Sequence, residues 1–266
     1  MKFFIDTANL AEIEAALKTG WIEGVTTNPS LLAKEPKANF LAHLKKIVDL
    51  IGERKLHLSA EVFSRNAAEI LAQAKEIKEE LNYPALSIKV QVGWDELAVI
   101  RSLAQTGISV NCTACMTVSQ AVLAAKAGSR YASLFWGRIR DAAPHLILGR
   151  RMQAAQKGNE KEAALLDEYY IQSSDLLSSG MASLDDFNPF SVMDRTRRIF
   201  DREKFHCEII AGSMRSVMDV RDSFIAGAHI VTVPPKLFLE LPKLAVHYKT
   251  DEVVKQFLTD FQSWLK

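Results

Sequence analysis

The sequence of 266 residues has few cysteines, no long apolar run and almost no net charge. Its three cysteines, Cys112, Cys115 and Cys207, are too sparse for a disulfide framework and fit a reducing compartment. No apolar stretch approaches the length of a membrane span, and the start, MKFFID, reaches an aspartate too early for a signal peptide. We therefore expect a cytoplasmic protein that does not enter a membrane.

Other features are missing as well. A net charge of +1 gives no overall attraction for nucleic acid or an anionic membrane, so any attraction for anions must be local. The six histidines show no ligand spacing, and no second CxxC motif accompanies Cys112 and Cys115. We therefore expect no metal site, and we regard a redox pair at this CxxC as the weaker interpretation.

What the chain does have is a regular alternation of short apolar strands and amphipathic helices. Strand patterns occur at residues 2–6, 24–27, 56–63, 86–92, 108–113, 131–135, 207–211 and 229–233. Helices of about ten to sixteen residues between them require parallel crossovers, and eight such units favour a closed barrel. The competing open doubly wound sheet lacks its glycine-rich fingerprint. We predict one α/β domain over residues 1–266, a (β/α)8 TIM barrel.

Two segments exceed the regular spacing. About seventy residues separate the sixth and seventh strands, and within them residues 141–190 form a predicted insertion. It could be a lid, a contact surface for another subunit or a plain surface elaboration. The predicted last helix, residues 252–265, has one apolar side. That side must cover its own barrel or dock on a neighbouring subunit, so we expect a homo-oligomer.

A lysine, Lys89, lies within the apolar strand of residues 86–92. Burying an ammonium group is costly unless it is paired or loses its proton, and a neutral amine is a nucleophile for carbonyl carbon. A strand-end lysine whose head reaches water is the simpler explanation for an isolated strand. The rest of the chain favours the nucleophile, held without its proton among hydrocarbon.

Polar side chains follow the carboxyl ends of seven of the eight predicted strands. Because strand residues alternate in direction, those in phase with Lys89 point into the barrel with it. The set comprises Asp6, Asn28, Glu61, Lys89, Asn111, Thr113, Ser133 with Phe135, and Ser213. Asn28 and Ser213 could equally be turn or capping groups. Barrel enzymes keep their chemistry at these strand ends, so together the residues predict an active site.

The residue types suggest their roles. A lysine that forms an iminium with a ketose needs a separate acid or base, which Asp6 or Glu61 can supply. The amides and hydroxyls of Asn28, Asn111 and Thr113 can hold sugar hydroxyls. A tetrahedral anion could be bound by Arg138, Ser213 and Arg215 with the amides of a helix start.

Seven segments carry a resemblance to a known family. They are FIDTAN, GVTTNPSLLAKE, SAEV, IKV, NCT, SLFWGRIRD and AGSMR. With them the chain resembles the transaldolases, of the short type that includes the fructose-6-phosphate aldolases. The resemblance leaves the insertion unmatched, and the proline that usually follows the IKV pair is absent here.

The resemblance implies a role for each matching position. Lys89 would be the Schiff-base lysine and Asp6 the acid/base group, while Glu61 with Thr113 would position a catalytic water. The substrate pocket would contain Asn28, Asn111, Ser133 and Phe135, and the phosphate ligands would be Arg138, Ser213 and Arg215. Glu61 and Phe135 resemble transaldolases, because the aldolases have a glutamine and a tyrosine there.

We therefore predict a transaldolase without a cofactor, which moves a dihydroxyacetone unit from an anionic ketose to an aldose phosphate. The ketose could be a phosphate or a sulfonate, since both are tetrahedral anions. Two alternatives stay open: an aldolase that releases free dihydroxyacetone, and a barrel that binds sugar anions without turnover.

Overall fold

The computed structural model describes residues 1–36 and 39–265, and eight of its strands form a closed parallel barrel. Each strand pairs with the next in sequence, and β8 closes the ring on β1. The strands are β1 Lys2–Asp6, β2 Ile22–Thr26, β3 His57–Glu61, β4 Leu86–Gln91, β5 Val110–Cys115, β6 Tyr131–Phe135, β7 Glu208–Gly212 and β8 Ile230–Val233. The predicted (β/α)8 barrel is confirmed.

Helices connect the strands and cover the outside of the barrel. They are α1 Leu10–Leu17, α2 Pro29–Leu32, α3 Phe40–Ile51 with the short η1 Gly52–Arg54, α4 Ala67–Leu81, α5 Trp94–Gln105, α6 Val118–Lys126 and α11 Val217–Ile225. Several begin at a side chain that accepts a backbone N–H, such as Asn9 before α1 and Thr117 before α6. Their apolar faces bury outward-facing strand residues, including Ile88 and Val90.

The barrel interior is divided along its axis. Toward the amino ends of the strands, Phe4, Ile210 and Ile230 form a small buried apolar cluster with Tyr131 against it. Above it the inward-facing residues are polar, and Lys89 pairs in register with Glu61 on one side and Asn111 on the other. Because alternation sends one side of each strand inward, this register gathers the polar side chains at the carboxyl ends.

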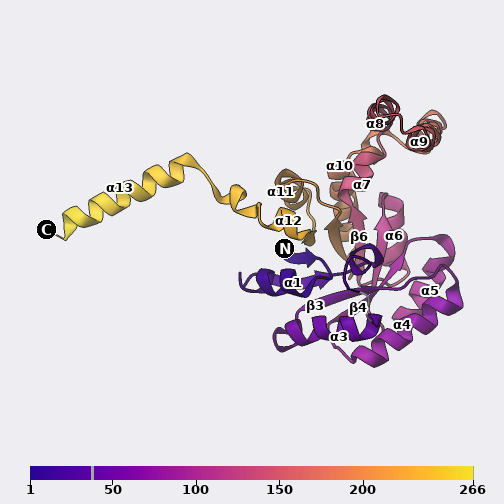
Figure 1. The fold of residues 1–266 in the computed structure, drawn as a ribbon, viewed down its shortest axis with the longest axis horizontal. Helices are drawn as coiled ribbons and strands as arrows, with labels where there is room; N and C mark the ends of the chain where they lie inside the picture. Colours follow the sequence, from indigo (N-terminus) through magenta and orange to yellow (C-terminus); the bar gives the residue numbers. More distant parts are fainter. Residues whose placement is uncertain (37–38, 266) are drawn as a thin grey trace.

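Five elements separate β6 from β7: α7 Trp136–Asp141, α8 Pro144–Gln156, α9 Glu160–Ser178, η2 Leu184–Phe187 and α10 Pro189–Glu203. Figure 1 shows α8 and α9 packed on each other beyond α7 and α10, away from the barrel. Their contact buries Ile147, Ala154, Ala163 and Leu166 in a cluster separate from the main core. The α8–α9 hairpin stands clear of the barrel in this structure, and its roles as a lid or as a contact surface for another subunit stay predictions.

The chain ends in α12 Pro235–Phe238, η3 Leu241–Ala245 and α13 Tyr248–Trp264. Helix α13 starts four residues before the predicted helix and extends away from the barrel as a separate arm (Figure 1). None of its residues is buried, and Phe257, Phe261 and Trp264 are exposed. The alternative in which this helix covers its own barrel is therefore wrong. Within residues 1–36 and 39–265, no helix has the length and apolar character needed to cross a membrane.

Candidate active site

A cavity of about 450 Å³ opens at the carboxyl ends of the strands. Its lining includes nine of the eleven predicted site residues: Asp6, Asn28, Glu61, Lys89, Thr113, Ser133, Phe135, Arg138 and Ser213. Residues that lie up to about two hundred positions apart in sequence are thus brought together by barrel closure. The two that do not line the cavity are Asn111 and Arg215.

Lys89 is buried on the wall of this cavity, with 5% of its surface exposed. Its Nζ lies 2.9 Å from Glu61 Oε2 and donates a hydrogen bond of 2.9 Å to the carbonyl oxygen of Thr27. The expectation that hydrocarbon surrounds this amine is therefore wrong, since its nearest partners are polar. A carboxylate at this distance can stabilise the ammonium and can also accept its proton.

Asp6 stands on β1 in the same cavity. It accepts a hydrogen bond of 2.7 Å from Thr26 Oγ1, which also lies 2.6 Å from Thr232 Oγ1. Burial raises the pKa of Asp6, and the charge of Lys89 and the Thr26 hydroxyl partly oppose this. Such a carboxyl is suited to carrying a proton in both directions.

Thr26 and Thr232 also line the cavity, although neither was predicted from the sequence. Thr26 lies in the TTN segment and has the inward phase of Asn28, which was a signal available in the sequence. Thr232 lies in the apolar strand β8, which gave no polar signal at its end. With Thr232 the eighth strand also contributes a polar group. The polar residues expected at the ends of seven strands thus come from all eight.

Thr113 faces the cavity with a buried hydroxyl. Within the part of the chain that the structure describes, Thr113 Oγ1 has no hydrogen-bond partner. A buried hydroxyl without a partner is costly, so this atom is a position where a substrate hydroxyl or a water would gain a bond. Residue Ala114 next to it has φ of 60°, and β5 shifts register between Cys112 and Cys115.

Asn111 takes a different position from the one expected of a substrate ligand. It is 0% exposed, and its Oδ1 accepts a hydrogen bond of 2.7 Å from Ser133 Oγ. Ser133 in turn lines the cavity, whereas Asn111 lies behind it. The geometry places Asn111 as support for Ser133. Asn28 lines the cavity and also caps α2 through its Oδ1, which accepts from Leu31 N at 3.0 Å.

Two of the three predicted anion ligands line the cavity. Arg138 and Ser213 line the cavity, and Ser213 has φ of 60°, a left-handed conformation that is uncommon for serine. The guanidinium of Arg215 instead lies 3.1 Å from Asp141 Oδ2 on α7. Arg215 therefore does not line the cavity in this structure, where a carboxylate 74 positions away in sequence holds it, and its role as an anion ligand stays a prediction.

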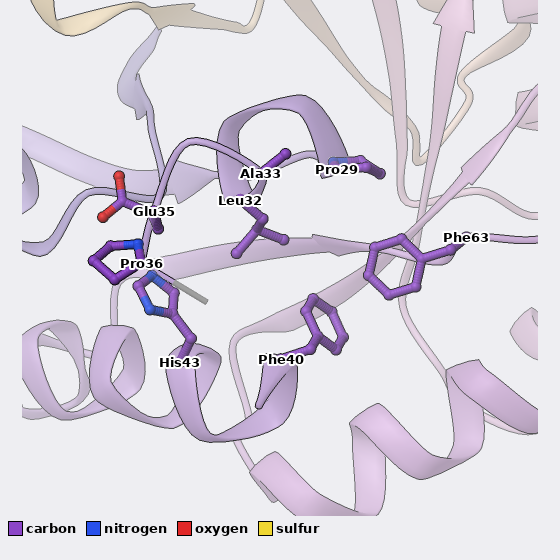
Figure 2. Close-up of a pocket in the computed structure, with 8 residues that line it drawn as sticks. All are labelled: Pro29, Leu32, Ala33, Glu35, Pro36, Phe40, His43 and Phe63. Atoms are coloured by element: carbon purple, nitrogen blue, oxygen red, sulfur yellow. The ribbon is translucent and has the colours of Figure 1, made fainter. Parts of the chain in front are cut away.

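A second hollow lies outside the barrel, between the segment after β2 and helix α3. It has a volume of about 570 Å³, and Figure 2 shows Leu32, Phe40 and Phe63 facing one another across it. His43 on its wall is hydrogen-bonded to the carbonyl oxygen of Ala8 at 2.7 Å. Its mainly apolar lining does not include Lys89 or Asp6, so the chemistry described above belongs to the barrel cavity.

The CxxC motif lies on β5, where Cys112 Sγ and Cys115 Sγ are 3.9 Å apart. Both thiols are buried, and the hydrogen bond to Cys112 together with burial raises the pKa of Cys115. A high thiol pKa disfavours the reactive thiolate. Among the described residues, no group of three or more His, Cys, Asp or Glu side chains could hold a metal ion.

The fold and the cavity define a class: a (β/α)8-barrel protein with a buried lysine and two carboxyl groups at the strand ends. Residues 3–265 match the model of the family described as Transaldolase/Fructose-6-phosphate aldolase, and the chain belongs to this family. A probable transaldolase of Desulfotalea psychrophila is 35% identical over 264 residues, 98% of each chain. A probable transaldolase of Geobacillus kaustophilus is 33% identical over 261 residues, again 98% of each.

A solved structure shares the fold at much lower identity. The thiamine phosphate pyrophosphorylase of Pyrococcus furiosus matches 91% of this chain and 94% of its own, with a TM-score of 0.53 and 10% identity. At this identity the likeness concerns the barrel architecture alone.

Proposed function

We propose that this protein is a transaldolase that transfers a dihydroxyacetone unit from an anionic ketose to an aldose phosphate through an imine on Lys89. The observation that carries the proposal is the buried Lys89 Nζ, 2.9 Å from Glu61, in a cavity that also contains Asp6. Glu61 accepts the ammonium proton, and the amine then attacks the ketose carbonyl carbon. Loss of water from the carbinolamine gives the iminium.

Asp6 acts on the bond to be broken. It takes the proton of the C4 hydroxyl, the C3–C4 bond breaks, and the aldose leaves as an aldehyde. The electron pair of that bond forms the C2=C3 bond of an enamine on Lys89, and the π pair of the iminium moves to nitrogen. The enamine carbon then attacks the acceptor aldehyde, and Asp6 returns its proton to the new alkoxide. Glu61 with Thr113, whose hydroxyl lacks a protein partner among the described residues, holds the water that hydrolyses the product imine.

Arg138 and Ser213 bind the acid end of the sugar, and Arg215 joins them when it leaves Asp141. Phosphate and sulfonate both fit this set of ligands in shape. Transfer is favoured over simple cleavage because the cavity contains Glu61 and the hydroxyl-free ring of Phe135. An aldolase, which releases free dihydroxyacetone, is the alternative.

Borohydride trapping tests the imine. The protein is reduced in the presence of fructose 6-phosphate or its 6-sulfonate analogue and analysed by intact mass and peptide mapping. We expect the mass of a reduced dihydroxyacetone unit on Lys89, and none in Lys89→Ala. Lys45→Ala, which changes an exposed lysine on α3, is the matched control and should be labelled as fully as the wild type. An adduct that persists in Lys89→Ala would contradict the mechanism.

The fate of the three-carbon unit separates transfer from cleavage. Free dihydroxyacetone is measured with and without an acceptor aldose phosphate. A transaldolase forms the new ketose and releases little free dihydroxyacetone, whereas an aldolase releases it at the same rate in both cases. Absence of any turnover, together with ligand binding, would support the binding protein without catalysis.

We also propose that the working form is a homo-oligomer. No residue of α13 is buried within its own subunit in the described structure, and a second copy of the chain would cover its apolar side.

A further inference from the structure

A chain of hydrogen bonds crosses the barrel interior from its amino end to the cavity. His57 Nε2 lies 2.7 Å from Ser59 Oγ, Asn111 Nδ2 donates to Ser59 Oγ at 3.1 Å, and Ser133 Oγ donates to Asn111 Oδ1 at 2.7 Å. The four side chains come from β3, β5 and β6 and are all buried. Only Ser133 among them lines the cavity, so the chain joins His57 to the site through two intermediate groups.

Counting donors and acceptors fixes the direction of this chain. Ser59 Oγ accepts a bond from Asn111, and among the described residues His57 Nε2 is the other hydrogen-bond partner of this hydroxyl, so Nε2 is the acceptor available to its one hydrogen. Nε2 is then an acceptor. At the cavity end of the chain, Ser133 Oγ donates its hydrogen to Asn111 Oδ1, which leaves a lone pair of Ser133 Oγ facing the cavity.

A proton on His57 Nε2 would leave the hydrogen of Ser59 without this acceptor, and reversing the chain would supply another one. Nε2 would donate to Ser59, Ser59 would donate to the oxygen of an Asn111 amide turned over, and the amide nitrogen would donate to Ser133. The hydrogen of Ser133 would then point into the cavity. The state of one nitrogen at the amino end of the barrel therefore favours one role for Ser133, either acceptor or donor.

The surroundings hold His57 in one orientation. Its ring stacks on Phe4, with centroids 4.9 Å apart and planes 13° apart, and meets the edge of Tyr131 at 4.7 Å. Gly24 allows this packing, because a Cβ there would lie 2.7 Å from the Phe4 ring and 2.9 Å from His57 Cβ.

The charges near His57 act in the same direction. Burial, followed by the charges of Lys2 and Arg130, lowers the pKa of His57 to about 3. The imidazole is therefore neutral at physiological pH, which leaves one ring nitrogen free to accept a hydrogen bond.

We propose that His57 is a positioning residue for this site: it accepts the hydrogen of Ser59 and thereby makes Ser133 an acceptor for a hydroxyl of the bound ketose. The inference rests on the proposed function only for the nature of the ligand. A sugar hydroxyl donates its hydrogen to Ser133, and reversal of the chain would remove this acceptor from the sugar hydrogen.

Steady-state kinetics of three variants test the proposal. His57→Phe keeps a flat ring but removes the acceptor, and we expect KM for the ketose to rise about tenfold with kcat little changed, as for the loss of one ground-state hydrogen bond. His57→Gln supplies an amide oxygen to Ser59 and should restore KM. In a Ser133→Ala background, His57→Phe should have no further effect on KM. An equal effect in both backgrounds would overturn the proposal.

His229→Phe is the matched control. This histidine also lies near the amino ends of the strands, where its Nδ1 accepts from Ile209 N at 3.0 Å, but it is outside the chain of four. Its loss should lower thermal stability and leave KM unchanged. An increase in KM equal to that of His57→Phe would show a general structural effect instead.

The tautomer gives a readout that does not depend on activity. Nitrogen-15 NMR of the free wild-type protein should show His57 Nε2 unprotonated and Nδ1 protonated at neutral pH. A hydrogen on Nε2 would overturn the inference even if the enzyme is active. Conversely, failed lysine trapping with the expected tautomer would refute the proposed function and leave the direction of the chain intact.

Discussion

In the proposed mechanism Asp6 carries a proton, and its burial in the cavity costs stability. Burial raises its pKa although Lys89 and Thr26 act in the opposite direction, so the group can exchange a proton with a sugar hydroxyl. Asp6→Asn keeps the shape and removes the proton carrier. We expect kcat for transfer to fall by about 10²- to 10⁴-fold, measured by the formation of the released aldose. A variant with more than a tenth of wild-type kcat would contradict the assigned role.

The same substitution should change stability with pH. The folded pKa of Asp6 is above the ordinary 3.8, so the protonated form adds stability below 3.8, and this is lost as pH rises through the folded pKa. Asp6→Asn should therefore be more stable than the wild type near neutral pH, with this advantage reduced in acid. Urea unfolding of both proteins, at pH values below and above the folded pKa of Asp6, measures this difference in stability.

Asp186 is a control, because its pKa is shifted in the direction opposite to that of Asp6. Burial acts to raise its pKa, but hydrogen bonds from Ser183 and the Arg195 charge outweigh this and lower it. Its carboxylate adds stability above pH 3.8 that is lost as pH falls through the folded pKa, so Asp186→Asn should be less stable than the wild type near neutral pH. The same sign for both variants would contradict the account.

Phe135 presents a ring without a hydroxyl to the cavity. Phe135→Tyr adds a group that can hold a water near the enamine, so protonation should compete better with the acceptor aldehyde. We expect release of free dihydroxyacetone to rise about tenfold without an acceptor, as for one added hydrogen bond. Phe135→Leu, which adds no hydroxyl, should not increase it. Equal release from both variants would point to altered packing as the cause.

At the scale of elements, the α8–α9 hairpin has its own small core. Leu166 is 1% exposed in that core, which is separate from the barrel core. Leu166→Asp should unfold the hairpin, because a carboxylate replaces a buried leucine, while barrel stability changes by less than about 0.5 kcal/mol. Rapid proteolysis within residues 144–178, with an unchanged main unfolding transition and unchanged kcat, would support this. Leu44→Asp in the barrel core is the control and should prevent folding.

The strands were predictable because their apolar runs alternate regularly with helices. Each observed strand begins and ends within two residues of its predicted bounds. Partners across the barrel were less predictable. The pairing of Arg215 with Asp141, and the burial of Asn111 behind Ser133, depend on how distant strands and helices meet. Thr232 was missed because one hydroxyl in an apolar strand has no distinctive pattern.

At the scale of the whole molecule, the alternation of eight strands with helices predicted the closed barrel, and strand phase predicted most of the cavity. Parity places Asp6, Glu61 and Lys89 on the inner side, and parallel pairing brings their ends to the same opening. Periodicity could not decide what α13 covers, since an amphipathic pattern identifies an apolar side but not its partner.

The exposed side of α13 leads to a prediction about assembly. It presents Phe257 with 65%, Phe261 with 57% and Trp264 with 78% of their surfaces exposed, an arrangement that a second copy of the chain would bury. We expect light scattering after size exclusion to give a homo-oligomer for the wild type, and smaller species for Phe257→Glu combined with Phe261→Glu. Lys255→Glu adds a similar charge on the same helix and should leave the assembly intact if the apolar side alone forms the contact. A monomeric wild type at micromolar concentration would contradict the prediction, and blue-shifted Trp264 fluorescence in the oligomer would locate the contact on this helix.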